Sequence, residues 1–304
     1  MGTDNNIVAI CVATYKRPEL LVNCLNSIGQ ISVPKNYTPV IIVVDNDNEK
    51  SAESSFNETT ENIDIESHYY VEPDRGICSA RNCLLEKALT HYAAYIAFVD
   101  DDELAHKQWL TNMIEGLQTY PSDIVAGPVV PIKETIAPET YITDPKRSSG
   151  SVPRNIPAGN VLFSARLVNQ LNLRFDRYFD FIGCEDFDFF DRAIKIGMKS
   201  VWIDDAIIFE TILPERETRK YIMYRHFTGG INVVMRYRRH HSLIRAWFRY
   251  LPKMIGKFID AFYSIVMAIF ISRSINFNKF IIKLSNGIGY LCGLTNIIVE
   301  RYRY

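Results

Sequence analysis

Residues 95–103, YIAFVDDDE, combine an apolar run typical of a buried strand with four consecutive acidic side chains. Two similar apolar runs precede it, IVAICVAT at 7–14 and VIIVVD at 40–45, and stretches with helical spacing of apolar residues separate them. This alternation is typical of a parallel sheet joined by crossover helices. Together with HYYV at 68–71 and DIVAGPVV at 123–130, the runs predict five strands of a doubly wound α/β domain.

The composition indicates a globular, reduced protein. The chain has 304 residues, of which 47% are hydrophobic and 23% charged, which excludes collagen-like, disordered and disulfide-stapled classes. Its six cysteines form no Cys-x-x-Cys pair. The first strand follows Asp4 with no basic segment before it, so we expect no signal peptide and a cytoplasmic protein.

Charge is distributed unevenly along the chain. Residues 1–213 hold 18 Lys and Arg against 31 Asp and Glu, whereas residues 214–304 hold 16 against 4. The asymmetry suggests an acidic body joined to a basic tail that meets an anionic partner, although the tail could simply neutralise its own body. The longest apolar stretch of the tail, 261–272, is too short to span a bilayer. We therefore expect a domain over 1–235 and a basic amphipathic helical region over 236–304, either membrane-associating or packed on the body or a second subunit.

The acidic run predicts a cation site. Alternate residues of a strand end point the same way, so Asp100 and Asp102 can address one ligand, with Asp101 between them. Hard oxygen ligands suit Mg²⁺ or Mn²⁺ bound to phosphates. A solvated turn or a helix cap is the alternative.

Two further segments carry polar groups at expected strand ends. Asp45 ends the second strand, where ligands of open α/β sheets bind, so it could accept hydrogen bonds from a base or ribose. An Asx turn is equally compatible. DRGICSARN at 74–82 adds Arg75 and Arg81, which could meet a base or phosphate or form plain ion pairs.

The segment FIGCEDFDFFDRAIKIG at 181–197 opens an expected helix with several acids. The helix dipole favours carboxylates there and explains one or two of them. Asp186, however, is flanked by phenylalanines, and an apolar setting can raise the pKa of a carboxylate towards that of a general base.

In order and spacing, six segments resemble family 2 inverting glycosyltransferases with the nucleotide-sugar (GT-A) fold: ATYKRPELLVNCLNSI, VVDNDN, DRGICSARN, FVDDDE, AGNVLF and GCEDFDFFDRAIKIG. The resemblance covers residues 7 to about 235. It implies a metal-dependent hexosyltransferase, an Mn²⁺ or Mg²⁺ cofactor and a nucleotide-diphospho-sugar donor, usually a uridine one.

Carried over by position, the resemblance assigns a role to each motif. The implied donor-binding residues are Thr14 and Arg17 in the first nucleotide loop, Asp45 at the base, Arg81 at the nucleotide, and Asp100 and Asp101 at the ribose or phosphates. Asp102 would ligate the metal. Glu185 and Asp186 match the family's Glu-Asp pair, with Asp186 as the base. Many relatives have a histidine near the metal where this chain has Glu210.

The stretch ERETRKYIMYRHFTGG at 215–230 resembles a subgroup that builds bacterial exopolysaccharide or lipid-linked glycans. The basic, aromatic tail suggests a saccharide or polyprenyl-linked acceptor and a peripheral location on the cytoplasmic face of the inner membrane. Arg225 recurs in this subgroup and could reach the diphosphate, or it could be a solvated or membrane-facing charge on a helix.

Three rival functions are weaker. A sugar-1-phosphate nucleotidyltransferase would carry a glycine-rich loop that ATYKRPEL lacks, and a non-catalytic nucleotide-binding membrane scaffold would lose acids that are present here. RYRRHH at 236–241 belongs to no recognisable nucleic-acid module, so we expect no nucleic-acid partner.

Overall fold

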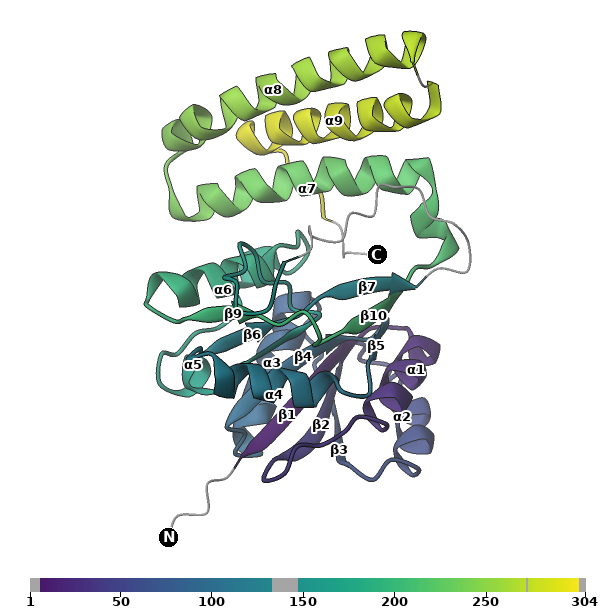
Figure 1. Cartoon of the computed structure of the whole chain (residues 1–304), viewed down its shortest axis with the longest axis vertical. Helices are drawn as coiled ribbons and strands as arrows, with labels where there is room; N and C mark the ends of the chain where they lie inside the picture. The colour runs from purple at the N-terminus through teal and green to yellow at the C-terminus, as the bar shows by residue number, and fades with distance from the viewer. Residues whose placement is uncertain (1–5, 133–146, 272, 301–304) are drawn as a thin grey trace. The chain divides into compact units, whose positions relative to one another are not determined.

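The computed structural model describes residues 6–132, 147–271 and 273–300 (Figure 1). The chain divides into two compact units, which we call the sheet unit (Met1–Asp180 and Glu185–Thr211) and the helical unit (Phe181–Cys184 and Ile212–Tyr304). The chain therefore passes between the units three times. The observed division lies at 211/212 rather than at the expected 235, because residue 235 is inside a continuous helix.

Described residues of the sheet unit form a seven-stranded sheet in the order β3-β2-β1-β4-β8-β6-β9. Its strands are β1 (Ile7–Thr14), β2 (Thr38–Asp45), β3 (Glu66–Val71), β4 (Tyr95–Asp100), β6 (Ile124–Ala126), β8 (Val161–Ser164) and β9 (Ser200–Trp202). β1 to β4 run parallel to one another, and β8 is antiparallel to β4 and β6. The expected mixed, mostly parallel α/β fold is confirmed.

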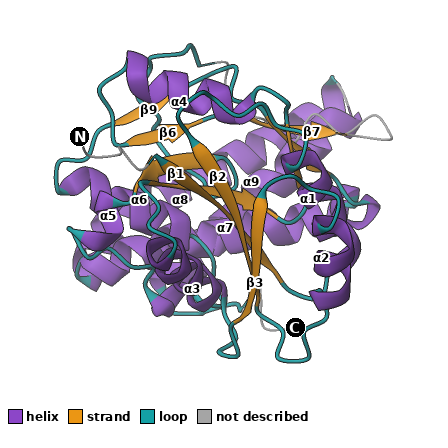
Figure 2. Cartoon of the chain, turned by 90° about the horizontal axis from the view of Figure 1, so that it is seen from below, coloured by secondary structure: helices purple, strands orange, loops and turns teal. Residues whose placement is uncertain are grey.

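The central strands read as continuous apolar runs because both of their faces are covered. Val8, Ile10 and Val12 of β1 belong to one buried cluster, and Ala9 and Cys11 to another. The first cluster includes side chains of α1 (Pro18–Ile28) and α4 (Trp109–Thr119), and the second includes side chains of α3 (Ile77–Thr90) and α6 (Glu185–Lys195). Figure 2 shows α3 and α6 on one side of β1–β3 and α1 with α2 (Glu53–Thr60) on the other.

The segment expected as one strand at 123–130 is two strands in two sheets. After β6 the chain enters β7 (Val129–Ile132), which pairs with β10 (Ile208–Thr211), and β10 also pairs with β5 (Glu103–Ala105). The break lies at Gly127, where a side chain would collide with the carbonyl oxygen of Ala206. Asn160 fixes this crossing by donating hydrogen bonds of 2.8 Å to the carbonyls of Pro128 and Ala206. The short helices α5 (Arg166–Asn169) and η1 (Arg177–Phe179) follow β8.

The helical unit consists of η2 (Pro214–Glu217), α7 (Arg219–His240), α8 (Leu243–Phe270) and α9 (Arg273–Leu294). Gly230 of α7 packs against Gly289 of α9, so the two backbones approach more closely than larger side chains would allow. The segment 181–184 is tied to α7 by a 2.9 Å hydrogen bond from the Asn232 amide to the Ile182 carbonyl. Among the described helices, none is long and apolar enough to cross a membrane.

Candidate active site

The candidate residues gather where three parallel strands end together. In the strand register Thr14 lies opposite Asp45, and Ala13 lies opposite Asp100. Ligands of open α/β sheets bind beyond this carboxyl edge. The sheet therefore brings the loop after β1, the loop after β2 and the acidic run after β4 to one edge.

Asp101 ties the first loop to the acidic run. Its buried carboxylate accepts hydrogen bonds from the Thr14 hydroxyl at 2.9 Å and from the Arg17 guanidinium at 3.1 Å. Burial raises the pKa of Asp101 to about 6, with Arg17 opposing the rise. Arg17 also lies 3.6 Å from Asp102, so it spans two of the three aspartates. Thr14, Arg17 and Asp101 thus form one structural group, and their contact with a donor stays a prediction.

The acidic run has the chemistry of a divalent-cation site. Burial raises the pKa of Glu103 well above its ordinary value, with Asp100 adding to the rise. Burial also raises the pKa of Asp100, although 44% of its side chain is accessible, and Arg81 opposes this. Asp102 is 8% exposed beside them. The raised pKa values of Asp100, Asp101 and Glu103 show that their ionised forms are disfavoured here, so a bound cation would stabilise the arrangement. Hard oxygen atoms fit Mg²⁺ or Mn²⁺.

Arg81 connects the acidic run to the Glu-Asp pair. This buried guanidinium on α3 donates to Asp100 at 3.1 Å and is paired with the Glu185 carboxylate at the start of α6. Burial raises the pKa of Glu185, and Arg81 opposes the rise. Arg81 therefore forms charge-assisted bonds to carboxylates from two distant segments of the chain. The prediction that it holds the nucleotide stays untested.

Asp186 is the acid of the pair that remains partly open. Its carboxylate accepts backbone N–H bonds from Phe187 at 2.7 Å and from Ala158 at 3.2 Å, and the residue is half-buried. Burial raises the pKa of Asp186, and Arg81 has the largest opposing effect. A fixed, accessible carboxylate with a raised pKa has the properties of a general base.

Asp45 is not accessible to a base or ribose here, although its place at a strand end had suggested this. Its side chain is fully buried and accepts hydrogen bonds from the backbone N–H of Asp47 at 2.9 Å, the N–H of Ala52 at 3.0 Å and the Tyr69 hydroxyl at 2.7 Å. The first of these is the Asx turn that was the alternative interpretation. Asp45 therefore organises the loop after β2, and its contact with a base stays a prediction.

Gly76, Asn46 and Asp180 orient α3, and sequence reasoning missed the last two. Gly76 has a φ of 141° and leaves no room for a side chain against Asp180. The Asp180 carboxylate accepts the Ser79 N–H at 3.0 Å, and the Asn46 side chain accepts the Gly76 N–H at 2.8 Å. These contacts fix the start of the helix that carries Arg81. Only the Asp-Arg-Gly triplet at 74–76 gave a signal, because glycine before a helix indicates an unusual entry.

Two other residues considered from the sequence are Arg225 and Glu210. Arg225 is an exposed residue of α7 in the helical unit, and its contact with the diphosphate stays a prediction. Glu210 lies directly opposite Glu103 in the β5–β10 pair, and the backbone N–H of Thr211 donates to the carbonyl of Asp102 at 3.0 Å. The strand position of Glu210 is thus beside the acidic run.

The comparison with known families settles the class of the chain. The model for glycosyl transferase family 2 matches residues 9–190, which include both the acidic run and the Glu-Asp pair. The chain belongs to glycosyl transferase family 2. The sequence resemblance is confirmed, and this glycosyltransferase carries its strand-end carboxylates inside the matched region.

Two relatives of known class are similar to the chain in sequence. The succinoglycan biosynthesis protein ExoM of Rhizobium meliloti is 28% identical over 247 residues, covering 79% of this chain and 78% of ExoM. The glycosyltransferase AglE of Haloferax volcanii is 29% identical over 125 residues, covering 40% of this chain and 39% of AglE.

Solved structures share the fold of this glycosyltransferase. The S. aureus TarS fragment 1–349 in complex with UDP has a TM-score of 0.55 and 16% identity, over 95% of this chain and 91% of TarS. The mannosyltransferase PcManGT of Pyrobaculum calidifontis, in complex with GDP-Man and Mn²⁺, has a TM-score of 0.65 and 16% identity, over 95% and 87%.

Proposed function

We propose that this glycosyltransferase moves a sugar, with inversion, from a nucleotide-diphospho-sugar of the uridine class to a hydroxyl of a saccharide acceptor. The bridge formed by Arg81 between Asp100 and Glu185 carries the proposal. It links a set of carboxylates suited to a metal-bound diphosphate with the segment that holds a partly exposed candidate base. The residues for the leaving diphosphate and the base for the attacking hydroxyl then lie at the same sheet edge.

In the proposed reaction the acceptor oxygen forms a bond to the anomeric carbon while the bond from that carbon to the diphosphate oxygen breaks. Asp186 takes the proton of the attacking hydroxyl, and its two backbone hydrogen bonds hold the carboxylate in place. Asp102, with Asp100 beside it, would hold Mn²⁺ or Mg²⁺, which supplies charge neutralisation for the departing nucleoside diphosphate. Arg81 and Arg17 keep these carboxylates in position.

The acceptor is proposed to be a lipid-linked saccharide used in cell-surface polysaccharide biosynthesis. The similarity to ExoM, a succinoglycan biosynthesis protein, supports the polysaccharide assignment. A membrane-borne acceptor also requires the enzyme to reach a lipid surface, and the helical unit has a feature suited to this.

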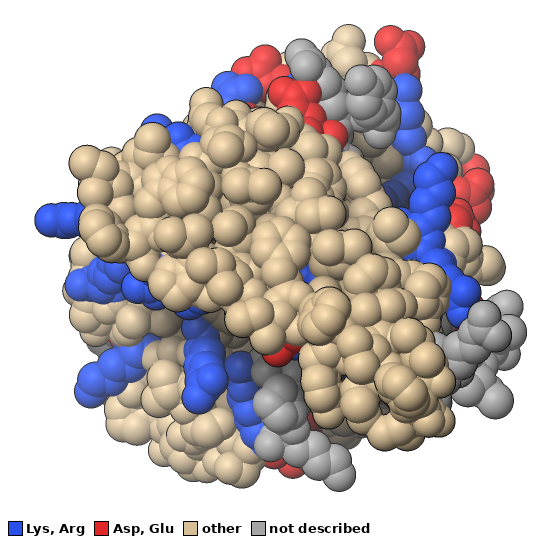
Figure 3. All heavy atoms as spheres, turned by 90° about the horizontal axis from the view of Figure 1, so that it is seen from above, with Lys and Arg blue, Asp and Glu red and all other residues tan. Residues whose placement is uncertain are grey.

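The feature is an apolar face along α8, which we call the outer face. Its members lie one or two helical turns apart and are strongly exposed: Ile244 68%, Phe248 80%, Ile255 47%, Ile259 62%, Phe262 71% and Phe270 78%. Soluble proteins rarely leave such a continuous apolar stripe in water. Figure 3 shows a broad surface of uncharged residues, with lysine and arginine side chains along its border.

Basic residues complete the match to a membrane. Arg245, Arg249, Lys253 and Lys257 lie on the same helix as the outer face, and each basic residue near an anionic surface contributes about 1 kcal/mol. A helix with an apolar face and a basic border lies in the plane of the lipid headgroups. We therefore propose a peripheral location on the cytoplasmic face of the inner membrane.

A donor screen tests the reaction. Purified protein with Mn²⁺ and a panel of UDP-, GDP- and dTDP-sugars is assayed for binding by calorimetry and for slow hydrolysis to the nucleoside diphosphate. We expect metal-dependent binding of the UDP class, and loss of that binding in Asp102→Ala. Equal affinity of the variant with and without Mn²⁺ would remove Asp102 from the metal site, and preference for a GDP- or dTDP-sugar would overturn the uridine assignment.

Vesicle flotation tests the membrane proposal separately. The double variant Phe248→Asp/Phe262→Asp changes exposed residues and should leave the fold intact, but it should no longer float with phosphatidylglycerol vesicles. Tyr92→Asp is a matched control, because Tyr92 is 78% exposed in the sheet unit. The proposal fails if the wild-type protein stays in the soluble fraction, or if the double variant floats as well as the control.

A further inference from the structure

A cluster of metal-binding side chains lies at the opposite end of the strands from the candidate active site. Glu66, His68 and His91 each offer a ligand atom, and these atoms all lie within 4.8 Å of one another. Glu66 and His68 belong to the first half of β3, and Glu66 is paired in register with Val40 near the start of β2. The active-site residues follow the carboxyl ends of the strands. The cluster is therefore a separate feature of the sheet unit.

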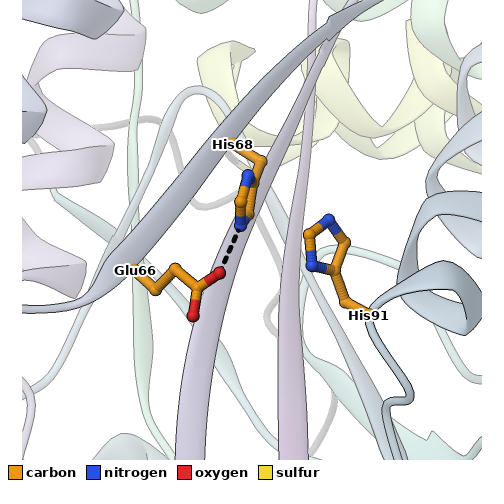
Figure 4. A group of neighbouring side chains, drawn as sticks. All are labelled: Glu66, His68 and His91. Atoms are coloured by element: carbon orange, nitrogen blue, oxygen red, sulfur yellow. Dashed lines mark hydrogen bonds and ion pairs between the residues drawn. The ribbon is translucent and has the colours of Figure 1, made fainter.

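Strand geometry brings two of the ligands together. Glu66 and His68 are alternate residues of a strand, so their side chains leave the same face. The His68 Nε2 atom lies 2.7 Å from Glu66 Oε1, and β3 is an edge strand, which leaves 62% of the Glu66 side chain and 30% of the His68 side chain accessible. Figure 4 shows these two side chains in contact, with His91 beside them.

His91 comes from the end of α3, and its ring faces the ring of His68. The two ring centroids are 4.0 Å apart with an angle of 35° between the planes. The Tyr70 hydroxyl lies 2.9 Å from His91 Nε2, so Nδ1 is the nitrogen left to bind a metal while Nε2 keeps its hydrogen bond. An outer partner of this kind fixes the orientation of metal-bound histidines. Burial and the nearby His68 lower the pKa of His91, which favours the neutral ring that a metal requires.

We propose that Glu66, His68 and His91 bind a divalent transition metal of the zinc class, with at least one coordination position left open to solvent. Two imidazoles and a carboxylate suit Zn²⁺, Co²⁺, Ni²⁺ or Cu²⁺, whereas the oxygen-only acidic run suits Mg²⁺ or Mn²⁺. Metal bonds of about 2.0–2.2 Å place ligand atoms roughly 3–4 Å apart. Because a metal lies in the plane of each imidazole that it binds, the facing rings of His68 and His91 rotate when the site closes. Lys87, whose ammonium is 4.5 Å from the centre of the Tyr70 ring, moderates the affinity by charge repulsion.

Cobalt binding to the full-length protein tests the site without reference to transferase activity. Metal-free protein titrated with Co²⁺ alone should develop the visible absorption of a nitrogen-ligated, four- or five-coordinate ion at one equivalent, and Zn²⁺ should displace it. His68→Ala and His91→Ala should each weaken Co²⁺ binding by at least about 100-fold, and Tyr70→Phe by about 10-fold, as for outer partners of metal ligands. His106→Ala, at an exposed histidine of the sheet unit, is the matched control and should bind normally.

Two results would overturn the proposal. The first is a Co²⁺ titration in which the wild-type protein shows only the weak spectrum of hydrated Co²⁺, or in which the double variant His68→Ala/His91→Ala gives the same spectrum as the wild type. The second is loss of the cobalt signal in Asp102→Ala, which would assign the ion to the acidic run instead. The donor screen measures nucleotide binding, and the cobalt titration measures a metal spectrum. The proposed function and the proposed metal site can therefore fail independently of each other.

Discussion

Arg81→Met should destabilise the sheet unit by about 3–5 kcal/mol, the usual cost of removing one partner from a buried ion pair. Methionine has a similar length and no charge, so packing is largely kept. Glu185 is 6% exposed and would lose its buried counter-ion. Asp100 has 44% of its side chain accessible and can regain water, so most of the cost arises at Glu185 and the loss should fall near the lower limit.

The destabilisation should depend on pH in a defined direction. Burial already raises the pKa of Glu185, and Arg81 opposes that rise. Without Arg81 the pKa rises further, so the carboxyl keeps its proton over a wider pH range. A raised folded-state pKa contributes stability that is present below the unfolded pKa and lost as pH increases through the folded pKa. The variant should therefore be closest to wild type near pH 5 and furthest from it near pH 8.

Urea unfolding followed by tryptophan fluorescence measures both effects. Trp247→Phe as a common background leaves Trp109 and Trp202, which both lie in the sheet unit. The double variant Arg81→Met/Glu185→Gln removes the uncompensated charge and should recover at least about half of the lost stability. The reasoning is refuted if Arg81→Met costs less than about 1 kcal/mol, or if the double variant is no more stable than the single one.

Other substitutions test single contacts of the site. Asp186→Asn keeps only one of the two backbone hydrogen bonds, because Phe187 and Ala158 donate to different oxygens, and it cannot accept the proton. Turnover should therefore fall by about 10²–10⁴ while donor affinity changes only a few-fold, and near wild-type single-turnover rates would contradict this. Because burial raises the pKa of Asp186, kcat/KM of the wild-type enzyme should increase with pH through that raised value, and a rate that declines over the same interval would exclude Asp186 as the base. Gly76→Ala places a side chain against Asp180 at a φ of 141° and should cost more than about 1 kcal/mol in urea unfolding, whereas wild-type stability would remove the steric argument. Asp45→Asn weakens three buried hydrogen bonds and should cost about 1–3 kcal/mol by the same method; no change would show that the loop after β2 is held by other contacts.

The parts of the fold that depend on local pattern could be predicted from the sequence. Apolar runs such as 7–14 and 40–45 read clearly as strands because both of their faces are buried. The run at 123–130 was misread as one strand because the break at Gly127 depends on the carbonyl of Ala206, which is distant in sequence. The same limit applied to the domain boundary, since a change in charge does not coincide with the end of a packed unit.

The candidate site shows the same division between local and distant information. Asp100, Asp102 and Asp186 could be selected because acids at a strand end or a helix start are unusual in an apolar setting. The buried Arg81 bridge and the Asp180 contact with Ser79 depend on pairings about 100 residues apart, which no local pattern encodes. For Asp45 the sequence left a ligand contact and an Asx turn equally open, because it gives a residue's place on a strand but not the groups that surround it.

The three passages of the chain between its units have a consequence for how this enzyme can be divided. The first passage follows Asp180, which anchors the start of α3. The second precedes Glu185 of the Glu-Asp pair, and the third follows Thr211, which is hydrogen-bonded to Asp102. The segment 181–184 is secured by Asn232 of the helical unit. A fragment ending at residue 211 would keep all strands of the seven-stranded sheet. It would lack Asn232, so the segment 181–184 that precedes the Glu-Asp pair would lose this hydrogen bond. We therefore expect truncation at 211 to abolish turnover before it abolishes folding of the sheet, which turnover and urea-unfolding measurements on the fragment would check.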